Sequence, residues 1–255
     1  REVGLRDGLQ SIARTLPTAQ KLQWIQGAYD AGIREIEVGS FVPPKLLPQL
    51  ADTAEVVRHA LGLSGLTVMA LTPNRRGAQA AFEAGVHKIT LPVSASEAHS
   101  LANVRKTCAQ MVQEVREVVR LRDEQAPQVK VEAGVSTAFG CTLQGAVDET
   151  HVLNLAQALA EAGVDDIGLS DTTGMADPAA VRRLVELAAD DRAAQATSPD
   201  AVRSALRVVA TSPVPQPVWT LGLGDDEISV RLVRLQADSR IRGTKLVCIS
   251  AAMLP

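Results

Sequence analysis

Short apolar runs alternate with longer amphipathic segments along the first 190 residues, which is the pattern of repeated β/α units around a parallel sheet. Runs rich in Val, Ile and Leu predict strands at Glu2–Leu5, Ile33–Val38, Leu66–Leu71, Lys88–Pro92, Lys130–Val135 and Asp166–Leu169. Helical periodicity predicts helices at about 17–31, 49–61, 75–84, 97–124, 148–162 and 178–189. Six units over this length predict eight in about 250 residues, the usual size of a barrel.

A repeated glycine supports the same fold. Gly32, Gly85 and Gly163 each follow an Asp-Ala or Glu-Ala pair, just after a predicted helix and just before a predicted strand. Glycine at this place supplies the left-handed cap that lets a short loop turn back into the sheet. We therefore expect a (β/α)₈ TIM barrel built with right-handed crossovers.

The last 65 residues have a different pattern. Three prolines between 213 and 217 exclude both a helix and a central strand there. Leu206–Ala210 and Lys245–Ile249 are candidates for the seventh and eighth strands, with a helix at Asp226–Ala237 between them. We expect one TIM-barrel domain over residues 1–255, regular over 1–190 and atypical, irregular or incomplete over 191–255.

Composition excludes several classes of function. The net charge of −3 and the aromatic content of 2% disfavour nucleic-acid binding, which needs basic surfaces and exposed rings. No apolar run is long enough to cross a membrane, and no basic-then-apolar leader opens the chain. Three scattered cysteines indicate a reducing compartment. We expect a cytoplasmic protein that binds neither nucleic acid nor membrane.

Candidate chemistry gathers where the predicted strands end, because these ends form the active-site mouth of a barrel. Arg6 and Asp7 follow the first strand, Glu37 lies in the second, and Asp171 follows the sixth. A carboxylate in a strand buried on both faces is unusual without a partner, which singles out Glu37. Three carboxylates beside a guanidinium suit a hard cation, Mg²⁺ or Mn²⁺, and a developing oxyanion.

Structural roles compete with these assignments. Arg6 and Asp7 could form an ordinary surface ion pair, and Asp171 could cap the helix that follows it. Cys141 is expected to be a small packed thiol, since no histidine lies near it in the sequence. The histidines at 59, 87, 99 and 151 are expected to be ordinary polar residues.

Several motifs, in order along the chain, resemble 3-hydroxy-3-methylglutaryl-CoA (HMG-CoA) lyase, a member of the metal-dependent TIM-barrel lyases and Claisen-type synthases. The resemblance covers about residues 1–188. The matching motifs are Glu2–Gln10 (EVGLRDGLQ), Ile36–Lys45 (IEVGSFVPPK), Leu71–Asn74 (LTPN), Ser94–Glu97 (SASE), Gly140-Cys141 and Leu169–Gly174 (LSDTTG).

The resemblance implies metal-dependent retro-aldol cleavage of HMG-CoA to acetyl-CoA and acetoacetate. It makes Asp7 a metal ligand and assigns Arg6 to the enolate. Glu37 and Asp171 complete the expected catalytic set, and the remaining pocket residues are expected to bind the substrate: Gln10, Ser136 and Thr172. The expected cofactor is Mg²⁺ or Mn²⁺, the partner is an acyl-CoA substrate, and a homodimer is one assembly compatible with the sequence.

The chain departs from this family after about residue 190. The two histidines of a His-x-His metal motif are absent, and Thr197–Val202 stands where spacing would place them. The Gly-Gly-Cys-Pro loop and a further Asn ligand are also absent, and Ser11-Ile12 replaces an Asn-Glu pair.

Three explanations of the departure are open. The tail could supply new ligands, such as Asp200 or Asp225–Glu227. The chain could be a lyase-like barrel with impaired catalysis. Alternatively, the tail could arise from a frame shift or truncation in the coding sequence. Another 3-hydroxyacyl-CoA, such as citramalyl-CoA, is the alternative substrate.

Overall fold

Six parallel strands form one sheet in the computed structural model, which describes residues 1–196 and 245–249. The strands are β1 (Glu35–Ser40), β2 (Thr67–Leu71), β3 (Lys88–Ser94), β4 (Lys130–Ser136), β5 (Asp166–Ser170) and β6 (Lys245–Ile249). Each strand pairs with the next in chain order. This consecutive order is the one that a β/α barrel requires.

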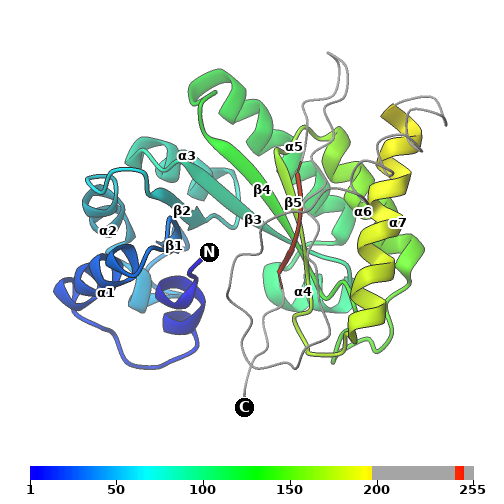
Figure 1. Cartoon of the computed structure of the whole chain (residues 1–255), viewed down its shortest axis with the longest axis horizontal. Coiled ribbons are helices and arrows are strands. Elements are labelled where there is room, and N and C mark those ends of the chain that lie inside the picture. The colour runs from blue at the N-terminus through cyan, green and yellow to red at the C-terminus, as the bar shows by residue number, and fades with distance from the viewer. Residues whose placement is uncertain (197–244, 250–255) are drawn as a thin grey trace.

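Helices surround the strands. They are α1 (Thr18–Asp30), α2 (Thr53–Ala60), α3 (Arg75–Ala84), α4 (Glu97–Val104), α5 (Cys108–Gln125), α6 (Glu149–Glu161) and α7 (Pro178–Ala196). Helices α1–α3 lie to one side of the strands β3–β5, and α6 and α7 lie to the other (Figure 1). No helix in the described residues is long and apolar enough to cross a membrane.

The predicted glycine caps are confirmed. Gly32, Gly85 and Gly163 have φ values of 93°, 82° and 90°, the left-handed region that side chains disfavour. Each turns the chain from a helix into the next strand. The core between the helices and the sheet is built from Val, Leu, Ile and Ala, as the low aromatic content predicts.

The first predicted strand, Glu2–Leu5, is wrong except at Glu2. Glu2 pairs with Ile36 as a single bridge, and the chain then forms a π-helical turn over Gly4–Gly8. The carbonyl of Val3 accepts hydrogen bonds from the amides of both Arg6 and Asp7, which turns the backbone away from the sheet.

The helix predicted over 97–124 is two helices. Arg105, with φ of 56°, ends α4 in the left-handed conformation. Thr107 then begins α5 with a capping box, in which its hydroxyl accepts from the Gln110 amide and the Gln110 side chain accepts from the Thr107 amide. The two caps satisfy backbone groups that a continuous helix would pair internally.

The predicted eighth strand occupies a different place. Lys245–Ile249 is β6, and it pairs directly with β5 over Asp166–Ser170, beside which the seventh strand of a barrel would lie (Figure 1). Leu206–Ala210 and Asp226–Ala237 lie outside the described residues, as do Thr197–Val202, Asp200 and Asp225–Glu227. The division of one domain at about residue 190 stays a prediction.

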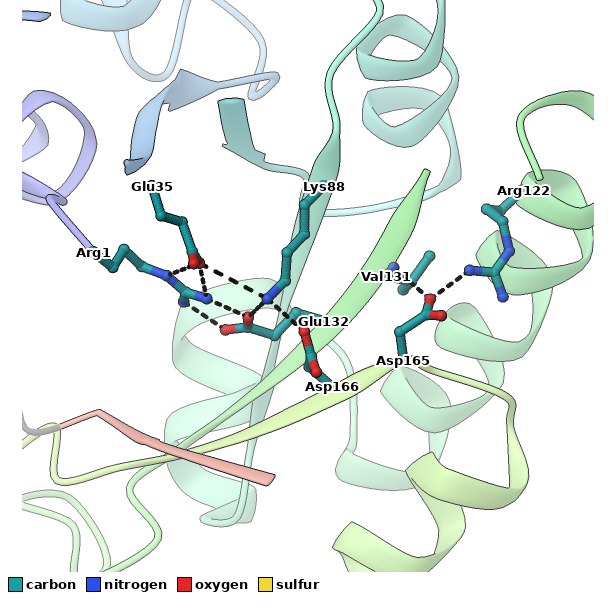
Figure 2. Close-up of polar contacts among 8 residues, drawn as sticks. All are labelled: Arg1, Glu35, Lys88, Arg122, Val131, Glu132, Asp165 and Asp166. Atoms are coloured by element: carbon teal, nitrogen blue, oxygen red, sulfur yellow. Dashed lines mark hydrogen bonds and ion pairs between the residues drawn. The ribbon is translucent and has the colours of Figure 1, made fainter. Parts of the chain in front are cut away.

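A charged network, the basal network, lies where the strands begin. It consists of Arg1, Glu35, Lys88, Glu132 and Asp166 (Figure 2). Arg1 donates two hydrogen bonds to the carboxylate of Glu132, at 2.7 and 2.6 Å, and one to Glu35 at 2.8 Å. Lys88 forms ion pairs with Glu132 and with Asp166, the latter at 2.6 Å. The network therefore joins the chain's first residue to β1, β3, β4 and β5.

The buried guanidinium of Arg122 joins α5 to the sheet. Arg122 donates to Asp165 at 2.6 Å, and the same carboxylate oxygen accepts from the Val131 amide at 2.9 Å (Figure 2). Arg122 also donates to the carbonyls of Val129 and Gly163. The buried charge of Arg122 is therefore compensated by acceptors on two loops, the one between α5 and β4 and the one between α6 and β5.

Candidate active site

Arg6 brings the two predicted carboxylates of the mouth together. Its Nη1 donates to Oδ1 of Asp7 at 2.8 Å, and its Nη2 donates to Oε2 of Glu37 at 3.2 Å. Gln10 donates to the same oxygen of Asp7 at 3.3 Å. The first turn after Glu2 and the strand β1 thus place four predicted site residues in one hydrogen-bonded group.

Close backbone packing holds this group in position. A Cβ on Gly4 would lie 2.8 Å from the ring of Trp24 on α1, so only glycine lets the turn approach that helix. A Cβ on Gly39 would lie 2.4 Å from Oγ1 of Thr53. That hydroxyl accepts from the Ser40 amide at 3.1 Å and donates to the Leu50 carbonyl at 2.7 Å. The two glycines therefore allow the segments that carry Arg6 and Glu37 to pack closely against Trp24 and Thr53.

Glu37 is almost fully buried and incompletely hydrogen-bonded. Its side chain is 3% exposed, and its Oε1 lies 3.1 Å from Arg6 Nε without the geometry of a hydrogen bond. Burial raises the pKa of Glu37, and the opposing charge of Arg6 offsets only part of that effect. A carboxyl with a raised pKa and an oxygen that accepts no hydrogen bond is suited to taking up a proton.

Further buried polar atoms lie along the neighbouring strands. Within the described residues, the hydroxyls of Ser40, Thr72 and Thr90 have no hydrogen-bond partner. Ser40 ends β1, Thr72 follows β2, and Thr90 lies within β3. Buried polar groups are normally paired, so an accumulation of unpaired ones indicates an interior prepared for water or a ligand.

Asp171 does not cap α7, as the competing structural assignment predicted, because the Ala180 amide in the first turn of that helix donates to Asp177 at 2.7 Å. Its two carboxylate oxygens accept from the amides of Met175 and Ala176, at 2.9 and 3.0 Å, and so shape the loop before α7. The structure gives no hydrogen bond or ion pair from Asp171 to the Arg6 group. Its catalytic role stays a prediction.

Ser136 and Thr172 lie on adjoining segments. Ser136 ends β4, and the amide of the next residue, Thr137, donates to Oγ1 of Thr172 at 2.8 Å. Thr137 was not among the residues predicted for the site, although it is completely buried and has a left-handed φ of 57°. No sequence signal identifies such a backbone at threonine. Cys141 is buried, as predicted for a packed thiol.

The described residues do not complete a metal site. Asp7 has a carboxylate that is one-third exposed. However, no three His, Cys, Asp or Glu side chains in the described part of the chain are grouped so that they could hold a metal ion. A hard divalent cation takes six or more oxygen ligands, so Asp7 alone leaves most positions to water or other groups.

Comparisons with known proteins bear on this site. The model of the HMGL-like family matches residues 1–197. The chain belongs to the HMGL-like family. Among its relatives are hydroxymethylglutaryl-CoA lyase YngG of Bacillus subtilis, 36% identical over 186 residues, and the 3-hydroxy-3-isohexenylglutaryl-CoA/hydroxymethylglutaryl-CoA lyase of Pseudomonas aeruginosa, 37% identical over 190 residues. The match covers 73% and 74% of this chain but only 62% and 63% of those relatives.

Solved structures of the HMGL-like family have the same architecture. The Bacillus subtilis HMG-CoA lyase superposes with a TM-score of 0.69 at 35% identity, covering 78% of this chain and 64% of that one. An Acinetobacter baumannii HMG-CoA lyase, in complex with coenzyme A and 3-methylmalate, gives 0.68 at 38% identity, with coverages of 72% and 59%. The predicted fold class, the TIM barrel of these lyases, is confirmed, and so is the resemblance found in the sequence.

Proposed function

We propose that this HMGL-like chain is a carbon–carbon lyase that cleaves HMG-CoA to acetyl-CoA and acetoacetate. Family membership supports the reaction class, and the coenzyme A complex of an HMG-CoA lyase supports an acyl-CoA substrate. One observation in this chain carries the proposal: the partly buried guanidinium of Arg6 faces both Asp7 and Glu37, while its Nε and the Glu37 Oε1 have no hydrogen-bond partner among the described residues.

The reaction needs a proton acceptor and an anion stabiliser. A base takes the proton of the hydroxyl on C3, the hydroxyl oxygen forms a carbonyl, and the bond between C2 and C3 breaks. The electron pair of that bond moves to C2 and the thioester oxygen as an enolate, and a proton returned to C2 completes acetyl-CoA. Glu37, with its raised pKa, is suited to hold a proton, and the Arg6 guanidinium is suited to the enolate oxygen.

The other predicted residues have supporting roles in this proposal. Gln10 restrains Asp7, and Ser136 and Thr172 border the pocket at the ends of β4 and β5. Mg²⁺ or Mn²⁺ is the cofactor expected from the family, with Asp7 as a ligand. Because the described residues do not form a complete site for it, no step is assigned to the metal.

Acetyl-CoA release from HMG-CoA tests the proposal directly. The purified, folded protein is assayed with Mn²⁺, with EDTA, and with citramalyl-CoA in place of HMG-CoA. We expect turnover of HMG-CoA that EDTA abolishes. Absence of turnover with either substrate, from a monodisperse sample, would reject the lyase activity, and preference for citramalyl-CoA would reject HMG-CoA as the substrate.

A further inference from the structure

Three hydroxyl or imidazole groups form a continuous polar chain at the C-terminal ends of β3 and β4. Oγ of Ser94 lies 2.8 Å from Nδ1 of His99 and 3.1 Å from Oγ1 of Thr137. Oγ1 of Thr137 also donates to the Ser136 carbonyl at 2.6 Å and accepts from the Ser96 amide at 3.1 Å. Ser94 and Thr137 are buried, so water does not substitute for these contacts.

The number of available hydrogens decides which group donates and which accepts in each of these hydrogen bonds. Each hydroxyl carries one hydrogen, and a carbonyl oxygen only accepts. The hydrogen of Thr137 is used on the Ser136 carbonyl, so Thr137 accepts at its contact with Ser94. Ser94 then uses its own hydrogen there and accepts from His99. Nδ1 of His99 therefore carries a hydrogen, because the reverse order would leave the Ser136 contact without a donor.

This order assigns a tautomer to His99. Burial lowers the pKa of His99, so that the ring is neutral at pH 7. A neutral ring with hydrogen on Nδ1 has an unprotonated Nε2, and the hydrogen bond at one nitrogen sets the state of the other. Among the described residues no donor contacts Nε2, which is left as an acceptor.

Thr137 transmits the arrangement to the proposed pocket. A β-branched residue with φ of 57° adopts a disfavoured backbone, which persists only where surrounding contacts hold it. Its hydroxyl makes three such contacts, to Ser94, Ser96 and Ser136. Its amide donates to Thr172, so the same residue borders Ser136 and orients Thr172.

We propose that His99, in its Nδ1–H form, is a positioning residue of the mouth, which acts through Ser94 and Thr137 to hold the ends of β4 and β5. The positioning role in catalysis rests on the proposed lyase function. The direction of the hydrogen bonds and their effect on Thr137 do not depend on that function, so the two are tested separately.

Nitrogen-15 NMR of the histidine rings at pH 7 tests the tautomer. His87 is an internal reference of opposite kind, because its Nδ1 accepts from the Val68 amide at 3.0 Å and its hydrogen is therefore on Nε2. We expect a protonated Nδ1 in His99 and a protonated Nε2 in His87, with the His99 signals assigned by their loss in His99→Asn. The same tautomer in both rings would overturn the proposal.

Hydrogen exchange of the Thr137 amide tests the positioning. In His99→Ala we expect exchange at Thr137 to accelerate about 10-fold or more, because Ser94 loses the hydrogen bond that His99 donates to it. His99→Asn keeps an amide donor near the Nδ1 position and should restore slow exchange. The Gly77 amide, which caps α3 through Asn74, is the reference. Equal acceleration at Thr137 and Gly77, or no change at either, would overturn the proposal.

Turnover separates the two proposals. If the wild type releases acetyl-CoA, His99→Ala should lower kcat about 10-fold or more through misplacement of the pocket, and His99→Asn should recover most of it. Unchanged kcat in His99→Ala would refute the catalytic role. If the wild type releases none, the lyase function fails, and the two NMR measurements still decide whether His99 positions Thr137.

Discussion

The two ends of the described sheet use similar charged side chains in different ways. In the basal network, Arg1 and Lys88 meet three carboxylates, and none of these side chains has a buried atom without a hydrogen-bond partner (Figure 2). At the mouth, Arg6 meets two carboxylates, but its own Nε and Oε1 of Glu37 lie 3.1 Å apart as an ion pair and have no hydrogen-bond partner within the described residues. A saturated network specifies a structure, whereas an unsaturated one has bonding capacity left for a ligand.

The pKa directions follow the same division. Burial alone would raise the pKa of Glu132, but hydrogen bonds and charges from Arg1 and Lys88 hold it below its ordinary value of 4.5. Burial raises the pKa of Glu37, and Arg6 offsets this only in part. Ionised Glu132 therefore stabilises the fold, while ionised Glu37 destabilises it. A carboxyl whose pKa is raised by burial in this way is typical of functional sites.

The largest expected effect is loss of stability in Glu132→Gln. Removing the charge leaves Arg1 and Lys88 in a buried site with too few counter-charges, which typically costs about 3–5 kcal/mol. Urea denaturation at pH 7 should show this as a lower midpoint. Glu149→Gln is the matched control, since Glu149 pairs with Arg183 at the surface, and it should leave the midpoint almost unchanged. Equal midpoints for the two variants would contradict the structural role of the basal network.

Arg6→Ala should have the opposite signature. We expect acetyl-CoA turnover to fall about 10²- to 10³-fold, as for loss of one oxyanion-stabilising donor. The free energy of unfolding should change less than in Glu132→Gln, because Glu37, whose pKa is already raised, takes up a proton when its cation is removed. Arg120→Ala, on the exposed face of α5, is the control and should keep full turnover. Arg6→Lys should recover little, because an ammonium does not reproduce the planar fork that meets Asp7 and Glu37. Loss of the fold in Arg6→Ala would assign Arg6 to structure.

The sequence predicted the local features of the fold and the charged centre of the site. Strand and helix positions and the caps at Gly32, Gly85 and Gly163 depend on neighbours in the sequence, so periodicity and glycine placement identify them. Arg6, Asp7 and Glu37 were found because carboxylates at the ends of apolar strands are conspicuous. The start of α5 was missed within the helix predicted over 97–124, although Thr107 and Gln110 have capping-box spacing.

Long-range partners could not be read in the same way. Lys88 and Glu132 are each visible as charges in apolar strands, but their pairing depends on the register of β3 against β4, in which Thr90 faces Glu132. Register is set by the whole sheet and not by any local signal. The left-handed backbone of Thr137 and the contact of His99 with Ser94 likewise depend on loops that meet only after folding.

The pH dependence of stability offers a finer comparison. Because the folded pKa of Glu132 is lowered, its contribution is present above about pH 4.5 and is lost as pH falls through the folded value. Burial alone would lower the pKa of Lys88, but Glu132 and Asp166 raise it above 10.5. The contribution of Lys88 to stability is therefore present below about pH 10.5 and is lost only as pH rises through the folded pKa. The free-energy gap between wild type and Glu132→Gln should thus be wide at pH 7 and close in acid. A constant gap would contradict ionisation as its cause.

The smallest expected effect on stability is that of Glu37→Gln, and it is the one that most directly contrasts the two ends of the sheet. The folded pKa of Glu37 is raised, so this carboxyl costs stability above its ordinary pKa of 4.5. The cost shrinks as pH falls below the raised value and is gone below about pH 4.5. The amide removes the buried charge while keeping the shape of the side chain. We expect a small rise in the free energy of unfolding at pH 7, which vanishes in acid, together with a large loss of turnover. Denaturation of Glu37→Gln beside Glu132→Gln measures this, because the same substitution should change stability with opposite sign at the two ends. A loss of stability in both variants would mean that Arg6 and Glu37 form a structural pair like those of the basal network.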